Sequence, residues 1–344
     1  MPIPSSGVSA KGSFLKKKIV RLAILSCSVL LVLFLWAKLS PLPATLFYRY
    51  IFNKEGKKVN AALDRYLPGG LTEQFDLVYD ATDRDGRLDL FYPAAMGKQK
   101  LALIIWAHGG GLISGSKEQL RNYCRILAGK GFAVASVDYA VAPRKRYPTP
   151  VIQVNAALAY LLANAGNLPI DTSKIFLAGD SGGSHIMAQV AAGISDPAYA
   201  AEVGFSPALL PGRLAGLVLF CGPYDTRTTH QEGAFGHFMH TVLWTYSGTK
   251  AFSQDPHFKT SSVIDYIGKG FPAAFISAGN GDPLLPQSEA LARKLGTLQV
   301  PVDTLFFAKD RNPPLPHEYQ FNLDSSAARE ALDRVVGFIH KRAG

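Results

Sequence analysis

The stretch Leu177-Ala178-Gly179-Asp180-Ser181-Gly182-Gly183-Ser184-His185 places one serine between glycines, directly after the apolar residues Ile175 and Phe176. Glycines on both sides predict a tight turn that side chains would obstruct. The spacing Gly-x-Ser-x-Gly between a strand and a helix is typical of a strained turn that exposes the serine hydroxyl at the helix start. The alternative is that Ser181 is only a turn residue, because glycine and serine favour turns in any case.

Strand and helix patterns alternate on both sides of this stretch. The predicted strands are 75–79, 88–92, 101–107, 132–138, 174–178, 214–220, 273–278 and 302–307. The predicted helices are 117–129, 151–165, 183–192, 287–295 and 327–340. Continuous apolar strands separated by helices indicate an α/β fold whose mostly parallel sheet is covered on both faces. In such sheets, functional groups gather at the carboxyl ends of the strands.

Polar or glycine-rich groups follow four of these strands. They are His108-Gly109-Gly110-Gly111, Gly179-Asp180-Ser181-Gly182-Gly183, Asp282-Pro283-Leu284 and Pro314-Leu315-Pro316-His317. Each group alone has an ordinary explanation as a turn or loop. Their occurrence at successive strand ends, in the order glycine loop, serine, aspartate, histidine, makes a shared site the better interpretation.

The three polar side chains match the parts of a nucleophilic site. A serine hydroxyl is a weak nucleophile and needs a base. His317, in the loop after the last strand, is the best candidate base for Ser181, and Asp282 is expected to orient its imidazole. Asp225, which follows the strand at 214–220, is the rival for the acidic role. We expect His185 to pack in the core and Asp180 to cap the helix that follows it.

The glycine loop supplies the other half of the predicted chemistry. We expect the backbone N–H groups of Gly110, Gly111 and Gly182 to form an oxyanion hole. A phosphate-binding loop is the alternative for residues 108–111. That alternative is disfavoured because neither a Gly-Lys-Ser/Thr ending nor a Gly-x-Gly-x-x-Gly helix start follows.

A stretch at about 226–268 interrupts the alternation and is rich in aromatic residues. We interpret it as a cap insertion over the strand ends, with ordinary core packing as an equally good alternative. The candidate substrate-binding residues are Leu112, Phe238, Leu243, Trp244 and Tyr246.

Charge and hydropathy set the N-terminus apart. Residues 1–60 carry a net charge of +9 and the rest of the chain only +1. A nearly neutral body makes nucleic acid an unexpected partner. A basic tail, 1–18, precedes the apolar segment 19–37, which approaches the length of a membrane-spanning helix. The apolar segment favours an uncleaved signal anchor over a cleaved signal peptide, because no small-x-small cleavage site follows it.

Nearby basic residues orient the N-terminus toward the cytoplasm, so the body is expected outside it, in a periplasm or lumen. Cleavage would instead give a secreted protein.

We interpret residues 38–70 as a linker with short helices that contributes to the cap. Residues 71–344 read as the catalytic domain. No metal-ligand motif occurs, so we expect neither metal nor cofactor. Cys124 and Cys221 could form at most one disulfide.

With these motifs in hand, the chain resembles the hormone-sensitive-lipase-like branch of the α/β-hydrolases, which includes microbial carboxylesterases and membrane-anchored arylacetamide deacetylases. The resemblance rests on the four groups above and on Asp138-Tyr139-Ala140-Val141-Ala142-Pro143, and it covers about residues 70–342. It implies an α/β-hydrolase fold, a serine nucleophile and a cap built from N-terminal and mid-chain segments.

Two departures concern the surroundings of the expected site. The branch usually has Arg-Leu-Ala-Pro-Glu after Asp-Tyr, where this chain has Ala140 to Pro143, and it usually has an aromatic residue at the position of Leu112. The substrate preference of the branch is therefore not carried over to this chain.

We expect an esterase acting on small to medium acyl esters. The alternatives are an amidase or deacetylase on the same residues, or a non-catalytic binding protein of the same fold.

Overall fold

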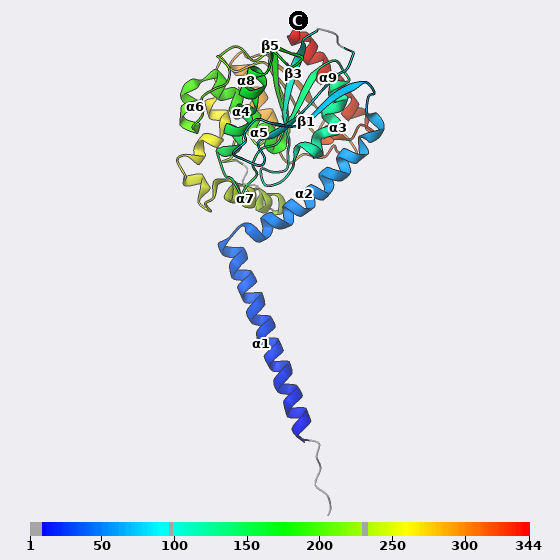
Figure 1. Cartoon of the computed structure of the whole chain (residues 1–344). Helices are drawn as coiled ribbons and strands as arrows, with labels where there is room; N and C mark the ends of the chain where they lie inside the picture. Colours follow the sequence, from blue (N-terminus) through cyan, green and yellow to red (C-terminus); the bar gives the residue numbers. More distant parts are fainter. Residues whose placement is uncertain (1–8, 96–98, 229–232) are drawn as a thin grey trace, which may run out of the picture.

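A single mixed sheet of eight strands forms the centre of the molecule (Figure 1). The computed structural model describes residues 9–95, 99–228 and 233–344. The strand order is β1-β2-β4-β3-β5-β6-β7-β8. The strands are β1 (Leu71–Val78), β2 (Arg87–Pro93), β3 (Leu101–Ala107), β4 (Ala133–Val137), β5 (Ile170–Asp180), β6 (Gly216–Phe220), β7 (Ala274–Ala278) and β8 (Val302–Phe306).

Only β2 runs opposite to the other strands, because both of its neighbours, β1 and β4, are antiparallel to it. Strand β1 pairs antiparallel with β2, and β2 pairs antiparallel with β4, while every other pair is parallel. All eight predicted strands are present within a few residues of their expected bounds. The mostly parallel α/β architecture is therefore confirmed, and the carboxyl ends of β3 and β5 to β8 lie along one edge.

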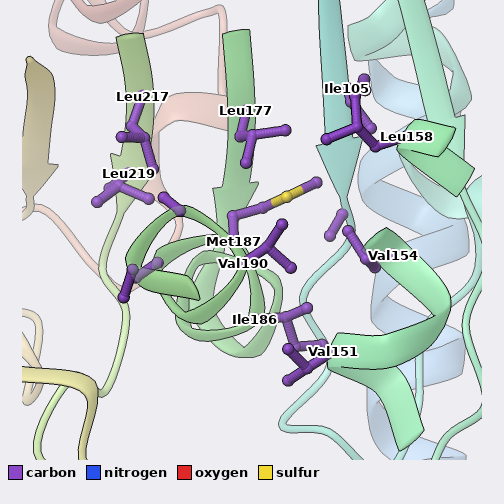
Figure 2. Packing of buried hydrophobic residues seen from close by; sticks show 14 of the residues in the cluster. Ile105, Val151, Val154, Leu158, Leu177, Ile186, Met187, Val190, Leu217 and Leu219 are labelled. Carbon is purple, nitrogen blue, oxygen red and sulfur yellow. The ribbon is translucent and has the colours of Figure 1, made fainter. Parts of the chain in front are cut away.

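Helices cover both faces of this sheet because the parallel strands are apolar on both sides. On one face, Leu103 and Ile105 of β3 join a core with α4 (Thr149–Ala163) and α5 (Ser181–Ser195). Figure 2 shows Leu177 of β5 next to Met187 and Val190 of α5 in this layer. The smaller α6 (Pro197–Val203), which the sequence did not predict, and α8 (Leu285–Thr297) pack on the same side.

The alternate residues of the same strands build the second layer. Ile104 and Trp106 of β3 pack with α3 (Lys117–Ala128) and α9 (Ser326–Ala343). Period-two alternation along each strand thus divides the apolar side chains between two cores. The two layers hold the strand ends rigidly, which is what a site assembled from several loops requires.

The N-terminal region differs from its predicted form. Helix α1 (Ser9–Leu39) contains Phe14–Trp36, a stretch of 23 residues with mean hydropathy 2.5, which is long and apolar enough to cross a membrane. Residues 1–8 of the expected basic tail lie outside the described residues, and the rest of that tail is helical. The expected linker with short helices is instead one 21-residue helix, α2 (Leu42–Ala62), followed by a single 3-10 turn. Hydrogen bonds of Thr45, Arg49 and Asn60 with the body stabilise α2 as one continuous helix.

The aromatic segment after β6 forms α7 (Gly233–Ser247) and three short 3-10 turns, Phe252–Gln254, Phe258–Ser261 and Val263–Tyr266. Four residues of the expected insertion, 229–232, lie outside the described residues. Figure 1 shows α7 beside α2, on the side of the body from which α1 projects.

Candidate active site

Ser181 occupies the turn between β5 and α5. Its φ of 47° lies in the left-handed region, which is strained for a residue with a side chain. A Cβ on Gly183 would overlap the carbonyl oxygen of Ala107 at the end of β3. The glycines of the opening stretch are therefore required because the helix start approaches the neighbouring strand too closely for any side chain.

Asp282 and His317 are brought together from loops 35 residues apart. The Nδ1 atom of His317 lies 2.9 Å from Oδ2 of Asp282. The other carboxylate oxygen, Oδ1, accepts the backbone N–H of Leu284 at 2.7 Å. Asp282 is buried, whereas the His317 side chain is 34% exposed. Asp282 is thus fixed by its own loop and in turn fixes the imidazole.

The surroundings of His317 favour its protonated form. Burial lowers its pKa, but Cys221 and Asp282 outweigh that effect and raise the pKa of His317 well above its usual value. Burial also raises the pKa of the Cys221 thiol to about 11, so this thiol is neutral at pH 7. The charge that attracts a proton to His317 near neutral pH is therefore that of Asp282.

Two other histidines near the strand ends are held neutral by burial. Desolvation lowers the pKa of His108 and of His185 to about 4. Nδ1 of His185 lies 2.7 Å from the carbonyl oxygen of Pro223, and its Nε2 lies 2.9 Å from the Gln189 amide. His185 is a packed core residue, as the sequence predicted.

Two aspartates differ in their surroundings from Asp282. Asp180 does not cap α5, which corrects the prediction from sequence. Its Oδ1 accepts the indole N–H of Trp106 at 2.7 Å, because the side chain points back toward β3. Asp225, the rival acid, accepts from Nε of Arg227 at 2.9 Å.

The glycine loop lies against the turn that holds Ser181. Gly110 has a φ of 105° and Gly111 a φ of 62°, so the loop reverses direction in the left-handed region. A Cβ on Gly182 would lie 3.0 Å from the backbone nitrogen of Leu112. The three backbone N–H groups predicted to bind an oxyanion thus belong to two segments in close contact.

One cavity of about 600 Å³ joins these parts. Ser181, His317, Gly110, Gly111 and Gly182 all line it. The lining is mostly apolar, and α2 and α7 contribute six residues each. The structure therefore brings the predicted nucleophile, base and oxyanion donors to one apolar pocket, with Asp282 behind the base.

The predicted substrate-binding residues divide into two groups. Leu112, Phe238 and Leu243 line the cavity. Trp244 and Tyr246 are not among its lining residues, which corrects that part of the prediction. The Trp244 ring lies 5.3 Å below the ammonium group of Lys250, and the Tyr246 ring packs 5.6 Å from that of Tyr147 in the core.

The sequence analysis assigned residues 38–70 to the cap but named none of the α2 residues that line the cavity. Tyr48, Ile51, Phe52 and Val59 line it. The ring centroids of Tyr48 and Phe52 lie 5.0 and 5.4 Å from that of Phe238 on α7. The spacing i, i+3, i+4, i+11 from Tyr48 is a helical stripe that could have been recognised in the sequence.

Cys221 was also missed as a neighbour of the site. Donor atoms of Cys221, Asp282 and His317 lie within 4.8 Å of one another, a set that could in principle hold a metal ion. The chemistry fits poorly, because metal ligation needs a thiolate and burial keeps this thiol protonated. Cys124 and Cys221 are both free thiols, so the possible disulfide is absent.

Comparison with known proteins points to one fold. The sequence signature of the alpha/beta hydrolase fold matches residues 104–310. The esterase LipQ of Mycobacterium tuberculosis (strain ATCC 25618 / H37Rv) is 24% identical over 269 residues, which are 78% of this chain and 62% of LipQ. The esterase LipC of the same strain is 27% identical over 208 residues, 59% of this chain and 50% of LipC. The chain thus spans between half and two thirds of these relatives.

Solved structures agree on the architecture. Esterase B from Lactobacillus rhamnosis superposes with a TM-score of 0.75 at 22% identity, covering 88% of this chain and 96% of that one. At that identity the likeness concerns the fold.

Proposed function

Because this chain belongs to the α/β hydrolase fold family, whose signature covers more than half of it, we propose that it is a serine carboxylic-ester hydrolase. The observation that carries the proposal is the strained Ser181 in one apolar cavity with His317, whose imidazole is bonded to Asp282. The esterases among its relatives support the reaction class. The cavity volume suits acyl groups of small to medium size.

The proposed reaction has two halves. Neutral His317 accepts the hydroxyl proton of Ser181 while the Ser181 oxygen attacks the ester carbonyl. Asp282 stabilises the imidazolium that forms, and the N–H groups of Gly110, Gly111 and Gly182 donate to the oxyanion. His317 then protonates the departing alcohol. Water, activated by the same imidazole, releases the acid and restores Ser181.

The proposed function also assigns a role to the catalytic domain, to the cap and to the N-terminal helix. We propose residues 71–344 as the catalytic domain, and residues 38–70 and about 226–268 as its cap. We propose α1 as an uncleaved signal anchor with the body outside the cytoplasm. Resistance of the full chain to alkaline carbonate extraction, with the body cleaved by protease only from the non-cytoplasmic side, is the expected result. Release by carbonate would contradict the anchor.

Hydrolysis of p-nitrophenyl esters, acetate through decanoate, tests the proposed reaction. The full chain is compared with Ser181→Ala and with Ser184→Ala. The latter is a matched control, because the Ser184 hydroxyl pairs with the Tyr224 hydroxyl at 2.8 Å and does not line the cavity. We expect Ser181→Ala to lose at least about 10³-fold in kcat, while Ser184→Ala retains turnover.

The other outcomes separate the alternatives. Equal turnover by wild type and Ser181→Ala would overturn the serine mechanism. A folded wild type without turnover on any ester would then be assayed on the corresponding anilides. Activity there would indicate an amidase, and binding without turnover a non-catalytic protein.

A further inference from the structure

Helix α2 presents three different stripes to its surroundings. One stripe bonds to the body: the Thr45 hydroxyl pairs with that of Thr245 at 2.7 Å, and Nε of Arg49 donates to the carbonyl oxygen of Ile113 at 2.6 Å. Asn60 belongs to the same stripe and accepts the backbone N–H of Asn122 at 2.9 Å. These bonds fix the rotation of α2 about its axis, so the direction of the other two stripes is fixed as well.

The second stripe faces the cavity and the third faces away from the protein. Tyr48, Ile51 and Phe52 line the cavity. Leu46, Phe47 and Tyr50 are 52%, 61% and 68% exposed. At 3.6 residues per turn, the exposed three lie on one side of the helix, largely opposite the cavity stripe. Large apolar groups at this exposure, grouped on one helix face, mark an interaction surface.

The stripe of α2 that faces away from the protein, here called the outward stripe, is apolar at its N-terminal end and basic toward its C-terminal end. Leu46, Phe47 and Tyr50 come first, and the exposed Lys54, Lys57 and Lys58 follow. Aromatic and aliphatic groups followed by lysines match a helix that lies in the headgroup region of a bilayer. The lysines suit anionic headgroups.

The position of α2 in the chain identifies the partner. Only Ser40 and Pro41 separate it from the membrane-spanning α1. Phe47 lies about 8 Å along α2 from its first residue at 1.5 Å per residue, a distance comparable with the depth of the headgroup region. Figure 1 shows α2 and α7 on the side of the body from which α1 projects. When α1 spans a bilayer, this side faces the lipid.

A second copy of the chain is the less suitable occupant. Three side chains bury at most about 250 Å² each, which together is less than the roughly 800 Å² per partner that a stable dimer interface needs. A bilayer already held in place by α1 requires no such area.

We propose that the outward stripe of α2 docks on the bilayer surface, so that the cavity behind α2 receives esters dissolved in the membrane. The substrate class is an amphiphilic ester whose apolar acyl chain partitions into lipid. The substrate passes beside α2 toward the aromatic cluster of Tyr48, Phe52 and Phe238, and so reaches Ser181 without crossing water. This substrate assignment rests on the proposed esterase function, whereas the docking does not.

A fluorescence measurement tests docking without reference to activity. The full chain carrying Cys27→Ser is reconstituted in phosphatidylcholine vesicles, and Phe47→Cys is labelled with an environment-sensitive dye. Leu210→Cys is the matched control, because Leu210 is 75% exposed in a loop elsewhere on the body. We expect blue-shifted emission at position 47, quenched by spin-labelled lipid, and water-like emission at position 210. Water-like emission at position 47, or a shift that grows with the protein-to-lipid ratio, would overturn docking.

A kinetic comparison tests delivery of the substrate. Phe47→Glu/Tyr50→Glu is expected to lower turnover of p-nitrophenyl decanoate embedded in the same vesicles about tenfold. Turnover of water-soluble p-nitrophenyl acetate should not change, and Leu210→Glu should change neither. Unchanged rates on both esters, or equal losses on both, would contradict delivery from the membrane. Absence of any ester turnover in the wild type would instead remove the proposed function and leave the dye measurement to decide docking.

Discussion

At the scale of single residues, the imidazole of His317 receives opposing influences. Burial disfavours its charge, while the Asp282 carboxylate at 2.9 Å favours it and prevails, so its pKa is raised. A general base must be neutral to accept a proton. Turnover should therefore fall as pH drops through the raised pKa of His317, on the alkaline side of the usual histidine value.

Substitution of the acid checks this assignment. Asp282→Asn removes the charge that stabilises the imidazolium, so the acid limb of kcat/KM should move to lower pH. In addition, kcat should fall by about 10⁴, the loss expected when the imidazole is held in the wrong tautomer. Asp225→Asn is the control, since that carboxylate pairs with Arg227. Comparable losses in the two variants would contradict the choice of Asp282 over its rival.

At the scale of elements, the junction of β5 and α5 depends on close backbone contact. The helix start packs onto the end of β3, where a Cβ at Gly183 has no room. This contact places the first turn of α5, with its unpaired N–H groups, at the strand ends. The position of Ser181 is thus a consequence of how the helix meets the sheet.

A pair of glycine substitutions measures that dependence. Gly183→Ala should lower the free energy of unfolding by about 2–3 kcal/mol and abolish ester turnover. Gly337→Ala in α9, where nothing lies within 4 Å of the added Cβ, should raise the free energy of unfolding by about 0.5–1 kcal/mol. Urea unfolding in a constant detergent provides both values. Similar changes at the two sites would show that the junction tolerates a side chain.

At the scale of the whole molecule, the two N-terminal helices have unlike relations to the body. None of the described side chains in the apolar part of α1 is buried, whereas α2 bonds to the body along its length and forms a wall of the cavity. The helix that is long and apolar enough to span a membrane is therefore separate from the fold, and the helix after it is an integral part of the cavity wall.

Two truncations distinguish these roles. Deletion of residues 1–38 should release the protein from membranes and change its unfolding temperature by less than about 2 °C, with p-nitrophenyl acetate turnover retained. Deletion of residues 1–62 removes Tyr48, Ile51 and Phe52 from the cavity wall, so turnover of longer acyl esters should fall further than that of acetate. Membrane release, melting curves and the two ester rates provide the test. Equal behaviour of the two truncations would contradict a structural role for α2.

The sequence by itself determined where the strands lie along the chain and which residues follow their ends. Apolar periodicity and turn chemistry act over a few residues, so the eight strands and the glycine turn around Ser181 could be predicted locally. Packing decided the rest, because it joins residues far apart in the chain. Trp106 bonds Asp180 across 74 positions, and Thr45 meets Thr245 across 200. Such contacts made α2 a wall of the cavity, turned Tyr246 into the core and placed Cys221 beside His317.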